Sequence, residues 1–227
     1  TAGSKVFEII WQPILHGKFG DLSADISAAW LWSKLVDRGG SRNRKGHEVL
    51  GYLRGGLGRM FDRLIEEIES AGGRVHLSKG IEGLTWQGDR IDSIVTREGT
   101  YPTDLVISGA QIPDLCRLLP ESSDSLQQRL SRIEFLGNVC LVLVLPRQLS
   151  QFYWTNVMDP DAPFVGIIEQ TNWVDPVDLN RKRLVYISAY CPSSDERFRM
   201  TAEELLEFYL PWIQRLFPSF TTEEVER

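Results

Sequence analysis

The sequence is poor in the residues that build metal sites and disulfide scaffolds. Its 227 residues include three cysteines and three histidines. Cys116, Cys140 and Cys191 are odd in number and far apart, so they frame neither a disulfide network nor a zinc site, and they favour a reduced, cytoplasmic setting. The histidines also lack metal-ligand spacing, so no protein-bound metal is expected.

Positive charge and long apolar runs are also scarce. The net charge of −6 argues against broad nucleic-acid binding, which needs clustered positive charge. The longest apolar run, residues 135–145, is interrupted by Gly137 and Asn138 and closed by Pro146. It is too short to cross a bilayer and suits a buried strand, so no integral membrane segment is expected. No signal peptide is visible. The sequence begins at Thr1 and not at a methionine, so it does not identify the natural N-terminus of the protein.

A glycine-rich segment, residues 49–58, leads into the most regular helical pattern of the chain. The apolar residues after it recur at three- and four-residue spacing, which predicts one stripe of an amphipathic helix. These residues are Leu57, Met60, Phe61, Leu64, Ile65 and Ile68. Gly72 and Gly73 are expected to end this helix, because glycine adopts a positive φ at little cost.

The same segment does not match a dinucleotide-binding fingerprint. A G-x-G-x-x-G motif beginning at Gly56 would need a small residue at position 61, where Phe61 stands. The acidic residue expected after the next strand is also missing, since Ser78 and Lys79 occupy that point. We therefore expect a tight turn in which the backbone passes close to another group.

The order of the remaining patterns predicts an α+β fold. Helical patterns lie at 6–15, 23–38, 113–119, 125–132 and 201–217, and strand patterns at 74–78, 81–86, 90–96, 104–108, 135–145, 152–158, 165–171 and 184–189. Thr201 and Glu204 predict a capping box, and residues 87–89 predict a hairpin turn. We expect 75–78 and 104–108 to pair in parallel, and the last four strands to form a mostly antiparallel sheet covered by helices.

Three segments, in this order and spacing, resemble a known family. Residues 53–58 (LRGGLG) run into a helix, residues 72–77 (GGRVHL) are followed by 80–84 (GIEGL), and residues 104–110 (DLVISGA) lead to Pro113. Together they resemble the flavin-containing amine oxidase superfamily, which includes protoporphyrinogen oxidase-like and phytoene desaturase-like enzymes. The resemblance covers most of residues 49–218. It implies an FAD-dependent oxidoreductase whose substrate is a small apolar or amine-bearing molecule.

The resemblance also implies a division into domains. Residues 1–70 would be a helical substrate-side region that carries the glycine-rich loop. Residues 71–115 would supply strands that complete an FAD-binding α/β domain, and residues 116–227 would form the substrate-domain sheet and the C-terminal helix.

Site residues follow from the same resemblance. The residue matching Ile81 touches the adenine end of FAD through its backbone, and the turn of Ser108, Gly109 and Ala110 lies against the cofactor domain. The substrate side is expected at the glycine-rich loop. Its residues are Tyr52, Arg54, Gly55 and Gly56.

The family's N-terminal Rossmann fingerprint and its second flavin-binding segment do not occur in these residues. The chain therefore resembles the central part of such an enzyme. We expect FAD in the full-length protein and weak or no FAD binding by this chain. The strands that would pack on the missing domain predict self-association. No catalytic acid–base set can be extracted, because flavin oxidation is largely the chemistry of the cofactor.

Two other functions stay open. The chain is also consistent with a non-catalytic α+β binding module that has lost its flavin. Alternatively, it is a flavin-dependent isomerase similar to sugar-nucleotide mutases, in which Arg42, Arg44 and Arg54 would meet phosphates.

Overall fold

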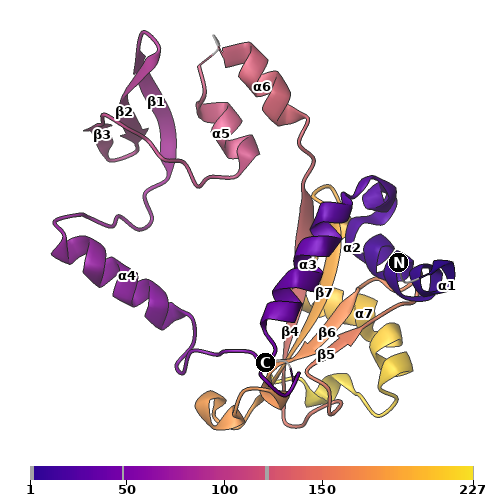
Figure 1. The fold of residues 1–227 in the computed structure, drawn as a ribbon. Coiled ribbons are helices and arrows are strands. Elements are labelled where there is room, and N and C mark those ends of the chain that lie inside the picture. Colours follow the sequence, from indigo (N-terminus) through magenta and orange to yellow (C-terminus); the bar gives the residue numbers. More distant parts are fainter. Residues whose placement is uncertain (1–2, 48, 121–122, 227) are drawn as a thin grey trace. The chain divides into compact units, whose positions relative to one another are not determined.

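The computed structural model describes residues 3–47, 49–120 and 123–226. The chain forms two compact units, which are described separately (Figure 1). The first unit joins residues 1–56 to residues 135–227, and the second comprises residues 57–134. The division by function at residues 70 and 115 stays a prediction.

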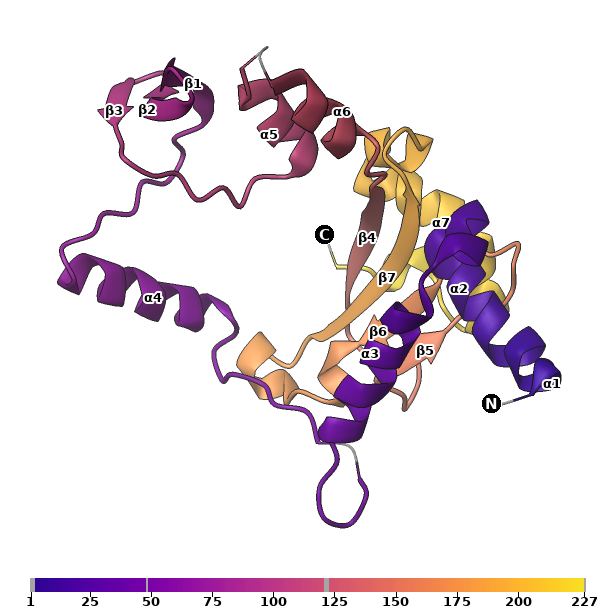
Figure 2. The same cartoon turned by 45° about the horizontal axis from the view of Figure 1, so that its top comes forward.

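Helices make up most of the N-terminal part of the first unit. They are α1 (Ser4–Val6), a π-helical turn (Phe7–Trp11), α2 (Gln12–Phe19), a 3₁₀ segment (Gly20–Asp25) and α3 (Ala28–Gly40). The helix expected from Ser23 begins later, because Ser27 accepts the backbone N–H of Ala29 at 3.2 Å and so caps α3. Figures 1 and 2 show α3 alongside the four-stranded sheet of this unit.

The four-stranded sheet confirms the predicted antiparallel arrangement. Its strands are β4 (Leu136–Leu145), β5 (Trp154–Asn156), β6 (Gly166–Glu169) and β7 (Arg183–Pro192). The spatial order is β4-β7-β6-β5, and every neighbouring pair is antiparallel. Strands β7 and β6 are therefore the central strands of the sheet, and β4 and β5 lie at its edges.

The core lies between one face of this sheet and α7 (Ala202–Leu216). Alternating residues of β4 and β7 point into it, as a two-residue strand repeat requires. From α7, Leu205, Tyr209 and Ile213 are buried against them. Although the apolar spacing of residues 205–216 would also place Phe208 and Leu216 in the core, both side chains are exposed.

Local capping signals are reproduced in α7. The hydroxyl of Thr201 accepts the backbone N–H of Glu204 at 3.2 Å, and the carboxylate of Glu204 accepts the N–H of Thr201 at 2.8 Å. The predicted capping box is thus confirmed. Short 3₁₀ segments connect the other elements: η4 (Gln170–Asn172), η5 (Pro176–Leu179), η6 (Glu196–Arg199) and η7 (Thr222–Glu224).

The second unit contains a helix, a three-stranded antiparallel sheet and two further helices. They are α4 (Gly58–Ser70), β1 (Ile81–Gln87), β2 (Arg90–Thr96), β3 (Gly99–Pro102), α5 (Ile112–Leu118) and α6 (Asp124–Ser131). The hairpin turn between β1 and β2 lies where the sequence predicts it. Gly72, at φ +86°, ends the turn that follows α4, and Gly73 N–H bonds to Ile68 O at 2.8 Å.

The predicted parallel pair in this unit is wrong. Neither residues 75–78 nor residues 104–108 form a strand; β3 at Gly99–Pro102 occupies the free edge of β2 instead. A strand needs a hydrogen-bonding neighbour, and the described part of this unit offers these two segments none. Their apolar side chains are accordingly exposed: Leu77 by 76%, Leu105 by 76% and Ile107 by 90%.

Candidate functional site

A cavity of about 400 Å³ in the first unit contains two of the predicted substrate-side residues. Tyr52 and Arg54 approach it from the glycine-rich loop, and Trp173 and Asp175 approach it from the segment between η4 and η5. Leu50, Val174 and Val177 complete the lining. The cavity thus combines aromatic and aliphatic surface with one guanidinium and one carboxylate.

Gly55 and Gly56 do not line this cavity; they shape the loop that carries Tyr52 and Arg54. The N–H of Gly56 bonds to Leu53 O at 2.9 Å, which closes a β-turn. Both glycines have positive φ, 84° and 86°. A β-turn with positive φ at its third residue favours glycine there, which explains Gly55. The positive φ of Gly56 favours glycine at the next position as well.

The opposite wall is held by a network of short polar contacts. The side-chain amide of Asn172 donates to Ser150 O at 2.8 Å and to Phe152 O at 2.9 Å. Asp175 Oδ1 accepts the backbone N–H of Val177 at 3.0 Å and so caps η5. Trp173 stands between these two anchors, and its position is therefore well defined.

Aromatic rings continue from the cavity toward the sheet. Trp173 packs edge-on against Tyr52, with ring centroids 5.9 Å apart, and its ring centroid lies 5.3 Å from that of Tyr153. Tyr186 of β7 donates its hydroxyl to Gln170 Oε1 at 2.6 Å. Burial raises the pKa of Tyr186, with Cys140, Tyr52 and Tyr153 as further contributors, so its phenol stays protonated.

Sequence reasoning missed Tyr153, Trp173 and Tyr186. Tyr186 lies at an even-numbered position of a predicted strand, which is the face turned away from α7. Strand alternation was the available signal for Tyr186. No comparable signal marks Trp173, because it lies in an irregular connection far from Tyr52 in the sequence.

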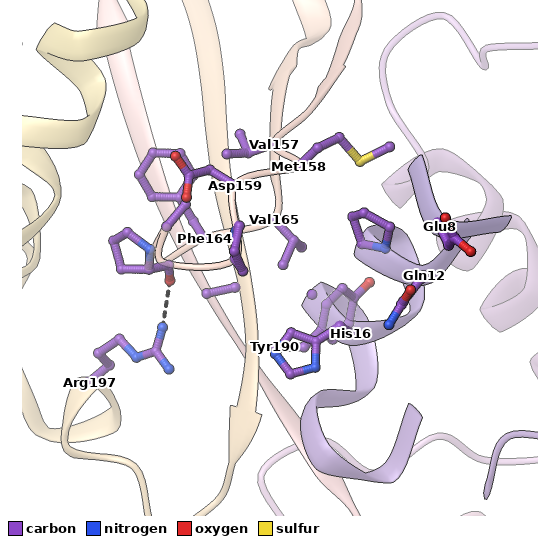
Figure 3. Close-up of a pocket in the computed structure, with 16 residues that line it drawn as sticks. Glu8, Gln12, His16, Val157, Met158, Asp159, Phe164, Val165, Tyr190 and Arg197 are labelled. Atoms are coloured by element: carbon purple, nitrogen blue, oxygen red, sulfur yellow. Dashed lines mark hydrogen bonds between the residues drawn. The ribbon is translucent and has the colours of Figure 1, made fainter. Parts of the chain in front are cut away.

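A second cavity, of about 350 Å³, lies beside the N-terminal helices (Figure 3). Glu8, Gln12 and His16 line it from one side at four-residue spacing, and Met158 and Val165 line it from the other. Residues four apart share a helix face, so this polar stripe was readable in the sequence. Our sequence analysis did not single it out.

An ion pair supports the floor of the second cavity. The guanidinium of Arg197 contacts both oxygens of Asp195 at 2.8 Å and donates through Nη1 to Pro163 O at 2.5 Å. The hydrogen bond and charge of Arg197 lower the pKa of Asp195 to about 2, and the carboxylate raises that of Arg197. With its guanidinium donors so engaged, Arg197 serves the fold here.

The predicted cofactor residues all belong to the second unit. Ile81 begins β1, and Ser108, Gly109 and Ala110 form an exposed turn before α5, which packs against β1. Ser108 Oγ accepts the N–H of Ala110 at 3.3 Å, and a Cβ added at Gly109 would meet no atom within 4 Å. The backbone of this turn is therefore accessible, and its contact with a flavin cofactor stays a prediction.

Among residues 3–47, 49–120 and 123–226, no group of three or more histidine, cysteine, aspartate or glutamate side chains could hold a metal ion. Within the same residues, no helix is long and apolar enough to cross a membrane.

The fold is shared with several enzymes of known structure. Reduced UDP-galactopyranose mutase matches with a TM-score of 0.69 at 12% identity, over 99% of this chain and 52% of that one. A proposed protoporphyrinogen oxidase from Exiguobacterium sp. 255-15 gives 0.62 at 15% identity, over 77% and 38%. An oxidoreductase from Methanosarcina mazei gives 0.60 at 18% identity, over 73% and 40%. These likenesses define the fold, and the chain spans about half or less of the length of each relative.

The chain belongs to the flavin-containing amine oxidoreductase family, whose sequence profile matches residues 8–227. This match confirms the predicted family and, at the level of the family, a flavin-dependent oxidoreductase. No curated protein sequence matches the chain significantly.

Proposed function

We propose that this chain is the substrate-binding region of an FAD-dependent oxidoreductase that acts on a small apolar or amine-bearing molecule. The observation that carries the proposal is the cavity in which Tyr52 and Arg54, assigned to the substrate side from the sequence, meet Trp173 and Asp175. Such concave sites with apolar walls and few polar groups are typical of small-molecule sites.

The lining suits an amine with an aromatic or aliphatic body. The Tyr52 and Trp173 rings offer apolar surface and electron-rich faces, which attract both hydrocarbon and cationic groups. Asp175 supplies a negative charge on the same wall, and its bond to the Val177 N–H fixes the orientation of that charge. Arg54 would bind an anionic group on the substrate or exclude a second cation.

In the same proposal, Ile81, Ser108, Gly109 and Ala110 contact FAD through their backbone in the full-length protein, which works in the cytoplasm. FAD, when bound, supplies the electron-accepting chemistry of the family. The residues of this chain then bind and orient the substrate and keep water from it. Tyr186, held as a neutral phenol, would present a polar but uncharged surface beside the aromatic rings.

A titration with two matched ligands tests this function. The intrinsic tryptophan fluorescence of the chain is followed while 2-phenylethylamine or the neutral 2-phenylethanol is added. Asp175→Asn preserves the cap of η5 but removes the charge, so it should weaken amine binding about tenfold, or ~1.4 kcal/mol, and leave the alcohol unaffected. Tyr52→Ala should weaken both ligands. Asp161→Asn, outside the cavity, is the control, and equal effects of the two aspartate variants would contradict the assignment.

The mutase-like alternative makes a different prediction at the same cavity. It is favoured by Arg54 in the lining, whereas Arg42 and Arg44 line neither of the two cavities described above. Tighter binding of uridine diphosphate than of 2-phenylethylamine, abolished by Arg54→Gln, would support the isomerase as the function of this chain and contradict the amine oxidoreductase. Binding of neither ligand, in a full-length protein without flavin absorbance, would favour the non-catalytic module.

A further inference from the structure

Lys18 lies at the meeting point of three aromatic rings. It belongs to the last turn of α2, and its Nζ lies 4.7 Å from the ring centroid of Tyr190 on β7 and 5.3 Å from that of Trp30 on α3. The ring of Phe19 completes the group at 5.9 Å and packs edge-on against Trp30, with centroids 5.0 Å apart. All four side chains belong to the first unit and are half-buried. The fold of that unit thus fixes one ammonium group against an aromatic surface.

The rings attract the ammonium but leave its hydrogen-bonding capacity unused. An aromatic face attracts a cation through its quadrupole. The ammonium also has three N–H donors, which need the lone pairs of an acceptor atom. Within residues 3–47, 49–120 and 123–226, Lys18 forms no ion pair or hydrogen bond, and the hydroxyl of Tyr190 has no hydrogen-bond partner. Both groups therefore have donors available to a ligand at one place.

The sheet face that carries Tyr190 has no charged strand residue. It is formed by the even-numbered residues of β4, β5, β6 and β7, because directly opposite residues of paired strands share a face. None of these strand residues is an aspartate, glutamate, lysine or arginine. The acidic residues next along the chain, Asp21 and Asp25, form no ion pair with Lys18 either. The described part of the chain thus gives Lys18 a neutral surface and no counter-charge.

A second hydroxyl on the same face extends the set of donors. Ser188 is the next residue on this face of β7, about 7 Å along the strand from Tyr190. Its Oγ accepts the side-chain amide of Asn138 at 2.9 Å, which leaves the hydroxyl proton of Ser188 to donate. Hydrogen bonds from an ammonium to a carboxylate or phosphate are roughly twice as strong as neutral ones. The rings of Trp30 and Tyr190 add apolar surface, so the arrangement suits an organic anion better than a bare inorganic ion.

We propose that Lys18 and Tyr190 form an anion-binding subsite for the carboxylate or phosphate group of a small organic molecule. The two anionic groups share a negative charge and acceptor oxygens, which the ammonium and the hydroxyl recognise. This subsite shares no residue with the cavity at Tyr52, and the inference does not depend on the proposed function. If Lys18 served the fold alone through its rings, removal of its charge would change stability without changing anion affinity.

Calorimetric titration with three related ligands tests the subsite. Phenylacetate and phenyl phosphate carry the two anionic groups, and phenylacetamide is the neutral counterpart. Lys18→Met keeps the apolar stem of the side chain against the rings but removes the charge, so it should weaken anion binding about tenfold and leave the amide unchanged. Lys18→Arg keeps the charge and should retain anion binding, and Lys34→Met, at an exposed position of α3, is the control. Anions that bind no more tightly than the amide, or equal losses in the two methionine variants, would overturn the inference.

Chemical modification of the wild type locates the bound anion without any variant. Acetic anhydride labels accessible lysine amines, and mass spectrometry of peptides measures the rate at each lysine. The tighter-binding anion, which identifies the group that the subsite takes, should slow acetylation of Lys18 and not of Lys34, and phenylacetamide should slow neither. A Lys18 that resists acetylation without ligand would mean that another group already covers the ammonium. That result, or an anion that leaves the rate at Lys18 unchanged, contradicts the subsite.

Discussion

The ion pair of Asp195 and Arg197 should make a measurable, pH-dependent contribution to stability. The two side chains are only 21% and 16% exposed, so solvent screens their interaction weakly. The pKa of Asp195 falls from 3.8 to about 2 in the folded protein. A difference of this size between folded and unfolded states corresponds to about 2 kcal/mol.

Replacement of Asp195 by asparagine isolates that contribution. Asparagine keeps an oxygen that accepts the backbone N–H of Arg197, so the cap of η6 is preserved while the charge is lost. Because the folded-state pKa is lower than the unfolded one, the contribution is complete above about pH 4 and is lost as the pH falls toward about 2. Near neutral pH the variant should therefore be less stable than wild type by about 2 kcal/mol.

Urea denaturation across this pH range measures the difference. The gap in unfolding free energy between wild type and Asp195→Asn should be constant from neutral pH to about pH 4 and then narrow. Asp161→Asn, at an exposed position, should show no such change. A gap that stays the same down to about pH 2, or no gap at neutral pH, would refute the assigned role of the ion pair.

Three further outcomes are expected. Gly56→Val should lower the free energy of unfolding by about 1–3 kcal/mol more than Ser41→Val, because Gly56 has a φ of 86°. A Cβ at Gly56 would meet no atom within 4 Å, so the cost comes from the backbone conformation and not from a clash, and equal thermal midpoints of the two variants would contradict it. Glu169→Ala should cost about 1–3 kcal/mol in chemical denaturation, because the buried carboxylate accepts the N–H of Leu149 at 2.8 Å; an unchanged stability would show that water replaces it. Titration of FAD into this chain, followed by flavin fluorescence and calorimetry, should show weak or no binding, because the chain lacks a fingerprint turn for the pyrophosphate. Stoichiometric binding at micromolar concentration would contradict this expectation and make the Gly55–Gly58 loop the leading phosphate site.

The sequence predicts those parts of the fold that depend on neighbouring residues. The hairpin at residues 87–89 and the capping box at Thr201 are both determined within a few positions, and both are confirmed. The apolar run at residues 135–145 and the strand pattern at residues 184–189 also identified β4 and β7. The strands predicted at residues 75–78 and 104–108 do not form, because an apolar run becomes a strand only when a partner strand is available to pair with it.

The candidate site was predictable in part for the same reason. The glycine-rich loop pointed to Tyr52 and Arg54 through its resemblance to a family motif. Trp173 and Asp175 reach the same cavity by tertiary folding alone, so no local pattern could bring them to Tyr52. The roles of Ile81 and of the turn at Ser108 stay predictions until a cofactor-bound form is measured.

The interrupted sequence of the first unit has a consequence for synthesis. The N-terminal helices belong to the same unit as β7, yet residues 57–134 emerge between them. α2 packs against β7, which is completed only at Pro192. At a translation rate of about 5–20 residues per second, α2 waits roughly 10–35 seconds for β7 to be completed. During that interval the apolar side chains of the N-terminal helices are open to chaperones and proteases, so a ribosome-bound nascent chain should be cleaved readily within residues 4–40.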